Sequence, residues 1–260
     1  MLSRKLDTAR AAFRSGDVEA ARAAHMHASH EAHHRGRYLK SVVYGGLDGI
    51  ITTFAVVAGV AGANLDVAVV LILGFANLIA DGLSMAIGDF LSTKAELQFA
   101  ATEREREAWE VEHFPDQERA ELVAVYMEKG MPASDAREMV AILSRHKCAW
   151  IETMMAAELG MPESDESPVG NGVATLLSFV AFGFVPLVAY VLSRLVTLPL
   201  SPLLLAVVLT AVTLFVLGTV KVRVVQMHWL RAGSEMLLVG GVAAVAAYAI
   251  GASLRAIVGS

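Results

Sequence analysis

The sequence predicts an all-α membrane protein: five transmembrane helices, with a polar block of three helices inserted between the second and the third. A mean hydropathy of +0.55 and 55% hydrophobic residues exceed the values of an ordinary soluble domain. The apolar residues gather in nearly uncharged runs of about 20 residues, the length of a helix that crosses roughly 30 Å of hydrocarbon. Charge gathers in residues 92–167, which hold 17 of the 26 acidic and 8 of the 21 basic residues.

Five apolar runs define the expected spans. They cover about residues 41–63, 67–91, 172–193, 202–222 and 234–256. The tripeptide NLD forms a turn between the first two spans, and LPLSP precedes the fourth. Pro186 should kink the third span because proline lacks a backbone donor. The chain therefore divides into a polar tail (1–37), spans one and two (38–91), the inserted block (92–167) and spans three to five (168–260).

Basic residues outside the spans predict the orientation of the chain, because cytoplasmic loops carry an excess of lysine and arginine. Groups of basic residues lie next to three span ends: Arg35, Arg37 and Lys40; Lys94, Arg104 and Arg106; and Lys221, Arg223 and Arg231. They fall on one side of the membrane if the N-terminus is cytoplasmic. The inserted block is then cytoplasmic as well, and the C-terminus lies outside.

The inserted block reads as three main helices, at about 92–113, 116–129 and 147–159, and a shorter one in ASDAREMVAILSRH. The first should continue directly from span two, because neither glycine nor proline stands between Gly88 and Pro115. Asp116 is expected to cap the second helix. Gly160 ends the last helix before the linker MPESDESP.

Acidic residues of the block recur at helical spacing. Glu103, Glu107 and Glu110 share one helix face, Glu118 and Glu121 are three apart, and Met154 and Glu158 are four apart beside Met155. Like charges at these spacings destabilise a helix unless a cation neutralises them. Carboxylates suit Mn²⁺, Fe²⁺, Mg²⁺ or Ca²⁺, and thioether sulfur favours a transition metal among these. From composition alone, a solvated acidic face with both methionines in the core is the favoured alternative.

Other metal chemistry finds less support in the sequence. Glu110 and His113 form one Glu-x-x-His pair, but Leu143 precedes His146 by three, so a ferritin-like centre lacks its second pair. Glu103 and His113 therefore stay weaker ligand candidates. The single Cys148 excludes a disulfide framework and a cysteine-rich metal site. The acidic excess favours cations as ligands, not nucleic acid.

Polar residues also lie inside the spans. Asn77, Asp81 and Met85 are four apart and form a stripe on one face of span two. In span one, Asp48 lies beside Gly45 and Gly49, a spacing typical of closely packed helices. Capping or a headgroup contact near a span end would explain Asp81 or Asp89, and plain lipid or core packing would explain Met85. Carboxylates within the membrane usually mark an ion or proton route, which favours a transport pathway here.

The tail up to residue 37 is polar, alanine-rich and expected to be helical, with a break at Gly16-Asp17. It contains a histidine cluster, formed by His25, His27, His30, His33 and His34. Histidine-rich tracts can bind metal, but a solvated tail is the favoured interpretation because no periodic carboxylate or cysteine accompanies them.

Four segments together resemble the vacuolar iron transporter family, whose members carry Fe²⁺ and Mn²⁺. They are YGGLDGIITTFAVVAG, GFANLIADGLSMAIGDFLSTKAE, FPDQERAELVAVYMEKG and AWIETMMAAELG, within a match over about 38–256. The resemblance implies a homodimer with its pathway between subunits, and a cytoplasmic three-helix metal-binding domain. It also implies proton-coupled antiport out of the cytoplasm. The ligands it implies in the domain are Glu107, Glu110, Glu118, Glu121, Met154, Met155 and Glu158, and in the pathway Asp48 and Met85.

The chain also departs from the family pattern. A pathway glutamate of plant members falls at Asn77, and Asp81 one turn later could substitute for it. The first 35 residues have no counterpart in that pattern, and the chain is bacterial in style, which places it in the cytoplasmic membrane as an exporter. Asp48, facing its symmetry mate and Met85, is expected to carry the exchangeable charge.

We therefore expect a proton-coupled exporter of Fe²⁺ and/or Mn²⁺ in the lipid bilayer, without prosthetic group and without enzyme activity. A membrane-anchored sensor or buffer that binds metal without transport is the alternative. A ferroxidase is disfavoured because the second Glu-x-x-His is missing.

Overall fold

The computed structural model describes residues 11–13, 15–25, 38–197, 199–225 and 228–258. These residues are helical or irregular, and no strand occurs among them. The chain forms two compact units: unit 1 comprises Met1–Phe90 and Val169–Ser260, and unit 2 comprises Leu91–Pro168.

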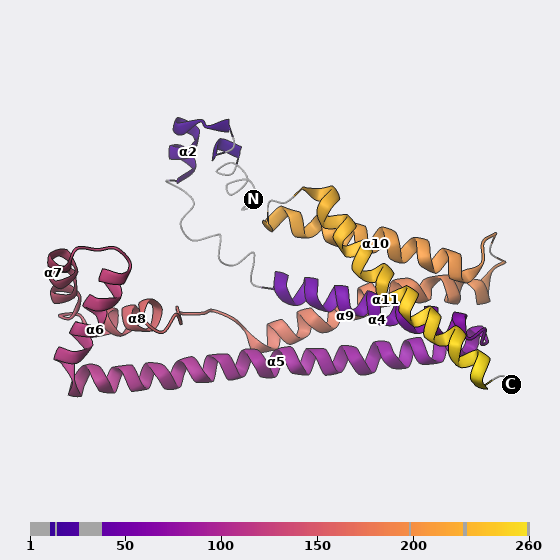
Figure 1. Ribbon diagram of the computed structural model, residues 1–260, viewed down its shortest axis with the longest axis horizontal. Coiled ribbons are helices and arrows are strands. Elements are labelled where there is room, and N and C mark those ends of the chain that lie inside the picture. The colour runs from indigo at the N-terminus through magenta and orange to yellow at the C-terminus, as the bar shows by residue number, and fades with distance from the viewer. Residues whose placement is uncertain (1–10, 14, 26–37, 198, 226–227, 259–260) are drawn as a thin grey trace. The chain divides into compact units, whose positions relative to one another are not determined.

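Five helices are long and apolar enough to cross a membrane, as the sequence predicts. Four are α4 (Leu39–Gly62), α9 (Pro168–Leu195), α10 (Pro202–Val225) and α11 (Trp229–Val258). The fifth, α5 (Val67–His113), is one continuous helix of 47 residues (Figure 1), so span two and the first helix of the block are not separated. Helix α9 starts with proline at its first position and continues through Pro186.

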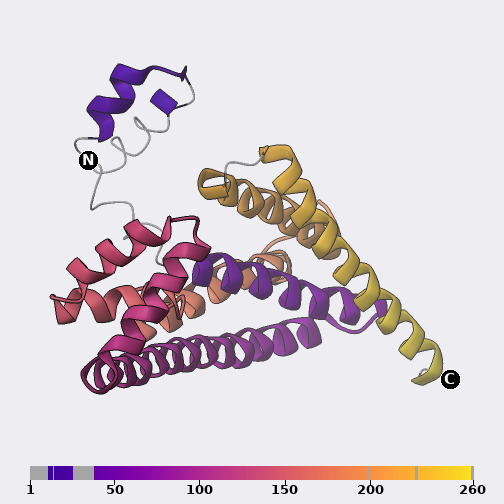
Figure 2. The same cartoon turned by 60° about the vertical axis from the view of Figure 1, so that its left-hand side comes forward.

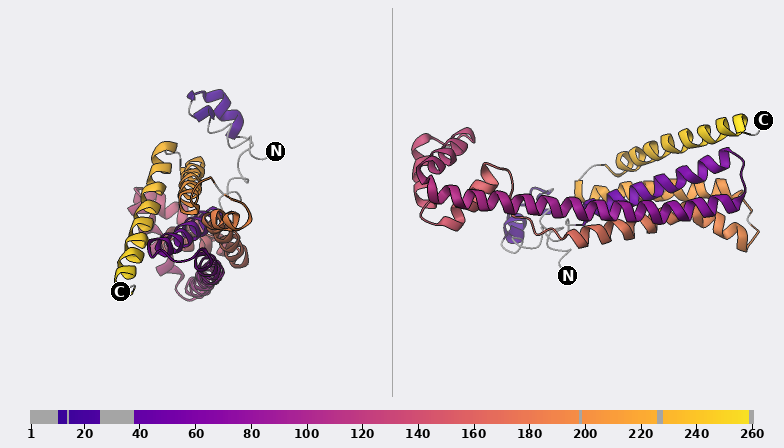
Figure 3. Two further views of the ribbon diagram at one scale, coloured as in Figure 1. Left: turned by 90° about the vertical axis from the view of Figure 1, so that its right-hand side faces the viewer. Right: turned by 90° about the horizontal axis from the view of Figure 1, so that it is seen from below.

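Unit 1 is built around α4, which packs on both α9 and α11 through glycine. A Cβ added at Gly45 would lie 2.6 Å from the carbonyl oxygen of Thr175, and one at Gly49 would lie 2.5 Å from that of Phe179. Near the other end of α4, Gly62 meets the backbone of α11 around Tyr248. Figure 3 shows these long helices side by side. The glycine pair predicted for close packing therefore packs within one subunit.

Helices α5 and α9 are joined by a buried polar contact and by a shared core. The Thr175 hydroxyl donates a hydrogen bond to the carboxylate of Asp89. Around Leu78 and Phe179, which are both fully buried, apolar side chains of the long helices form the core of the unit. Asp89 is therefore engaged by a side chain of a neighbouring helix, a contact that the sequence did not predict.

Unit 2 consists of the last part of α5 and three short helices: α6 (Pro115–Glu128), α7 (Ala133–Leu143) and α8 (Lys147–Ala157). These gather around the end of α5, as Figure 2 shows from a second side. Their core comprises Val111, Leu122, Val140, Trp150, Ile151, Met154 and Met155. The expected cap is wrong: α6 begins at Pro115 after Phe114, and Asp116 instead forms an ion pair of 2.6 Å with Arg119.

The predicted break in the N-terminal tail is confirmed. Gly16 has φ +70°, a left-handed conformation that glycine adopts without strain. Asp17 then caps α2 (Val18–His25), because its Oδ1 accepts hydrogen bonds from the backbone N–H groups of Glu19 and Ala20. Of the histidine cluster, His27, His30, His33 and His34 lie outside the described residues.

Candidate functional site

Unit 2 brings glutamates of three helices into one cluster. Glu107 and Glu110 come from α5, Glu118 and Glu121 from α6, and Glu158 follows α8. Their carboxylates are near enough for their charges to interact: those of Glu110, Glu121 and Glu158 act on Glu107, and those of Glu107 and Glu121 act on Glu118. We call these five residues the glutamate cluster. The sequence predicted all five as ligands, and the structure places them together.

Two members form a buried floor of the cluster, and two lie at its exposed rim. Glu107 and Glu118 are only 1% and 5% exposed, whereas Glu121 and Glu158 are exposed. The Oε2 atoms of Glu107 and Glu118 are buried and have no hydrogen-bond partner among the described residues. Burying an ionised carboxylate without compensation costs several kcal/mol, so these two oxygens call for a cation or a proton. The interpretation as a solvated acidic face is wrong for both residues.

Burial and mutual repulsion hold protons on the cluster. Burial, reinforced by the charges of Glu107 and Glu121, raises the pKa of Glu118 from 4.5 to about 7. Burial also raises the pKa of Glu107, although Arg106 opposes the shift. At the rim, partial burial of the carboxyl and the charge of Glu121 raise the pKa of Glu158. A cation that enters the cluster must therefore compete with protons near neutral pH.

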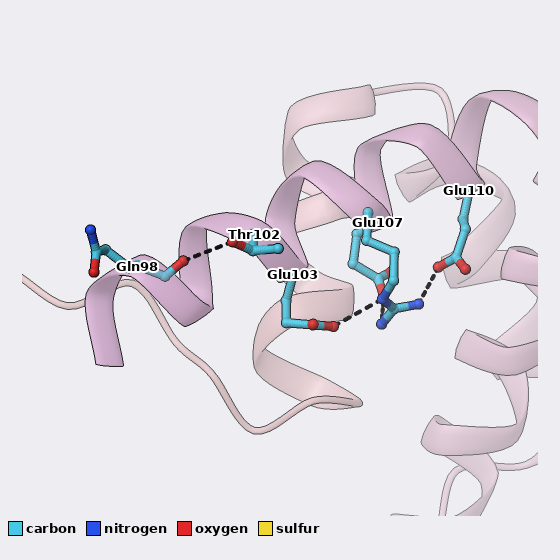
Figure 4. A network of polar contacts seen from close by, with 6 residues as sticks. Gln98, Thr102, Glu103, Glu107 and Glu110 are labelled. Carbon is cyan, nitrogen blue, oxygen red and sulfur yellow. Dashed lines mark hydrogen bonds and ion pairs between the residues drawn. The ribbon is translucent and has the colours of Figure 1, made fainter. Parts of the chain in front are cut away.

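A single arginine occupies one side of the cluster, and the sequence interpretation missed it. Arg106 donates from Nε to Glu103 at 2.9 Å and from Nη2 to Glu107 at 2.8 Å, and it also pairs with Glu110. Figure 4 labels Glu103, Glu107 and Glu110 in this network. Glu103 lies three residues before Arg106 and Glu110 four residues after it, and this helical spacing could have predicted both ion pairs from the sequence.

Both candidate methionines belong to the hydrophobic core of unit 2. Met154 is fully buried and Met155 is 4% exposed, and they pack with Leu122 and Trp150. The interpretation of the methionines as core residues is thus confirmed. Both methionines lie on α8 about one turn before Glu158, so they are close to one member of the glutamate cluster in sequence.

The two weaker candidates are engaged elsewhere. Glu103 pairs with Arg106, and the Nδ1 atom of His113 lies 2.8 Å from the carbonyl oxygen of Trp109. The His113 ring also stacks on the Trp109 ring with centroids 4.2 Å apart. No three His, Cys, Asp or Glu side chains in the described part of the chain are arranged to hold a metal ion as they stand. Metal binding would require the glutamates to turn towards a common point.

In unit 1, the structure brings together two carboxylates of the predicted pathway. Asp48 on α4 and Asp81 on α5 are partly buried, and their charges interact. Asn77, one turn before Asp81, has a buried Nδ2 atom without a partner among the described residues. Met85 packs against the core around Phe179. That Asp48 faces its symmetry mate and Met85 stays a prediction.

Comparisons with known proteins agree with this architecture. The model of the VIT family matches residues 39–252. A protein of Toxoplasma gondii named vacuolar iron transporter is 37% identical, over 99% of this chain and 91% of its own length. One of Plasmodium berghei with the same name is 34% identical over 98% of both chains. Vacuolar iron transporter 1 of Arabidopsis thaliana is 30% identical over 83% of this chain and 85% of its own.

These alignments also correct one expectation and leave another without support. The alignment with the Toxoplasma gondii protein covers 99% of the chain, so the N-terminal tail does have a counterpart among relatives. These relatives are from apicomplexans and a plant, and they give no support to a bacterial origin. With five spanning helices, an inserted helical unit and a family match over most of its length, the chain belongs to the VIT family.

Proposed function

We propose that this protein is a homodimeric transporter that moves Fe²⁺ and/or Mn²⁺ out of the cytoplasm in exchange for protons. The observation that carries the proposal is the floor of the glutamate cluster: two nearly inaccessible carboxylates, Glu107 and Glu118, whose Oε2 atoms have no partner. Such groups, buried among three more carboxylates, are stable only when protons or cations offset their charge, and a metal ion can replace the protons. The relatives named vacuolar iron transporters support the same substrate class.

The donor atoms of the cluster suit divalent transition metals. Carboxylate oxygens bind hard cations, and the thioether sulfurs of Met154 and Met155 add a preference for softer ions such as Fe²⁺. Glu107, Glu110, Glu118, Glu121 and Glu158 would supply the oxygens once they turn inward. The pKa of Glu118, at about 7, means that metal uptake releases protons at cytoplasmic pH.

The membrane part would carry the ion past Asp48, Asp81 and Met85. Two interacting carboxylates at membrane depth are stable only when a proton or a cation offsets their charge. Loading by metal from one side and by protons from the other would give antiport. The distribution of basic residues favours a cytoplasmic position of unit 2 and the N-terminus, and metal captured there would be carried out of the cytoplasm. We assign the protein to the cytoplasmic membrane, and a vacuole-type membrane is the alternative that the names of the relatives favour.

Flux into proteoliposomes tests the proposal. Wild type should carry Mn²⁺ and Fe²⁺ faster with an opposing proton gradient than without one. Asp48→Asn should lose this flux yet keep metal binding in unit 2. Glu107→Gln should weaken binding in unit 2 by roughly tenfold or more while some flux at high metal concentration remains.

The rival function predicts a different pattern. A membrane-anchored buffer or sensor would bind Mn²⁺ through the glutamate cluster and show no flux in any variant. A proton gradient without effect on wild-type flux would refute antiport, and full Mn²⁺ binding by Glu107→Gln would refute the cluster as the metal site.

A further inference from the structure

Arg106 is the cation that the cluster already contains. It pairs with Glu103, Glu107 and Glu110, and no other described Lys, Arg or His forms an ion pair with the cluster or with Glu103. Its charge also acts on Glu158. One guanidinium therefore neutralises part of an array of six carboxylates, Glu103 included.

The geometry differs from that of an ordinary surface ion pair. Three different nitrogen atoms of Arg106 contact three different glutamates, so each guanidinium nitrogen donates to one carboxylate. The pairing with Glu107 involves a carboxylate whose side chain is 2% exposed, while the Arg106 side chain is 43% exposed. The arginine thus reaches from the solvent side to the buried floor and pairs with both Glu107 and Glu110. In this arrangement no three acidic, histidine or cysteine side chains of the described residues are placed to hold a metal ion.

We propose that Arg106 is an internal competitor for the metal: it occupies the glutamate cluster in the metal-free protein and must swing out before Glu107 and Glu110 can ligate an ion. This inference rests on the proposed function. Because an exposed guanidinium is free to move into water, its displacement lowers metal affinity without blocking binding. An internal competitor lowers the binding affinity of every cation by the same factor. Arg106 therefore sets the metal concentration at which the cluster becomes occupied.

Metal affinity of the full-length protein tests this inference. Arg106→Gln should bind Mn²⁺ about 5- to 30-fold more tightly than wild type by calorimetry, the range expected when two or three weak ion pairs no longer compete. The affinity for Mg²⁺, which binds weakly, should increase by the same factor. Arg106→Lys, which keeps the charge but cannot contact three carboxylates at once, should fall between the two.

Arg104→Gln is the matched control. Arg104 lies one half-turn away on α5, is similarly exposed at 47% and pairs with Glu152 outside the cluster. Its removal changes the charge of unit 2 equally, so it should tighten Mn²⁺ binding by no more than about twofold. Equal effects of the two substitutions would refute the inference, and so would weaker binding by Arg106→Gln, which would make Arg106 a residue that positions the ligands. A gain for Mn²⁺ but not for Mg²⁺ would contradict it too.

A measurement on the wild-type protein keeps the test independent of whether variants fold. Phenylglyoxal modifies accessible guanidinium groups, and mass spectrometry resolves the rate at each arginine. Saturating Mn²⁺ should raise the rate at Arg106 several-fold and leave Arg104 unchanged, whereas an unchanged rate at Arg106 would refute its displacement. If Glu107→Gln binds Mn²⁺ as wild type does, the proposed metal site fails; if it does not, and Arg106 still has no effect, only the inference about Arg106 fails.

Discussion

Replacing Glu118 by glutamine should stabilise the metal-free protein above neutral pH. Glu118 is 5% exposed and lies beside Glu107 and Glu121, and its pKa is raised from 4.5 to about 7. Because the folded protein holds this proton more firmly than the unfolded chain does, the group contributes stability that is fully present below pH 4.5 and is lost as the pH rises to about 7. Glutamine keeps the shape of the protonated acid and cannot lose the proton.

The magnitude follows from the difference between the two pKa values. One unit corresponds to 1.36 kcal/mol, so the shift of Glu118 corresponds to about 3 kcal/mol when the group is fully ionised. Most of the change falls between pH 5.5 and pH 8, where wild type should lose about 2 kcal/mol of unfolding free energy. At pH 8, Glu118→Gln should be more stable than wild type by about 2–3 kcal/mol.

Tryptophan fluorescence can follow this change in unit 2. The chain has three tryptophans, and Trp109 and Trp150 lie in unit 2, so Trp229→Phe removes the signal of unit 1. Chelator-treated protein in detergent would be unfolded with urea at both pH values. Glu128→Gln, at an exposed position at the end of the same helix, is the matched control and should retain the wild-type slope with pH.

Two results would refute this reasoning. An identical pH dependence of wild type and Glu118→Gln would mean that Glu118 does not hold the extra proton. A loss of stability in Glu118→Gln at pH 8 would mean that the ionised carboxylate is compensated in the folded protein. Saturating Mn²⁺ should abolish the pH-dependent loss in wild type, because the metal takes the place of the proton.

The remaining predictions concern packing. Gly49→Ala should destabilise unit 1 by about 1–3 kcal/mol, since its Cβ would lie 2.5 Å from the carbonyl oxygen of Phe179, whereas Gly88→Ala, with nothing within 4 Å, should be harmless in the same thermal assay in detergent. Met154→Leu conserves the volume of a fully buried side chain and should change stability by less than about 1.5 kcal/mol. If its sulfur ligates metal, the same variant should bind Fe²⁺ more weakly; unchanged affinity would assign Met154 to the core alone.

The helices could be predicted from the sequence because their signals are local. Apolar runs of spanning length, the turn at residues 64–66 and the absence of a breaker before Pro115 define α4 and α5 nearly to the residue. The start of α6 was predicted one residue too late, because Pro115 takes the first position of the helix and Asp116 falls within its first turn, where it pairs with Arg119.

The sequence could predict which glutamates form the cluster, but not which of them are buried. Spacing identifies glutamates that share a face on α5 and on α6, and the family resemblance adds Glu158; these five do meet. Which of them become inaccessible depends on how α6 and α8 pack on α5, and this is a tertiary property that places Glu107 and Glu118 inside and Glu121 outside. The glycine pair of α4 is similar: the sequence predicts a close neighbour, and only the fold identifies it as α9.

The family resemblance implies a pathway glutamate at the position of Asn77 in plant members, and Asp81 can be compared with it in physical terms. Asn77 and Asp81 are four residues apart on α5, so a carboxylate moved from the first position to the second shifts by about 6 Å along the helix and stays on the same face. The charge of Asp81 acts on Asp48, which shows that this face is directed towards α4. Under the proposed function, the carboxylate that α5 contributes to the pathway would therefore stand one turn later in this chain, at Asp81.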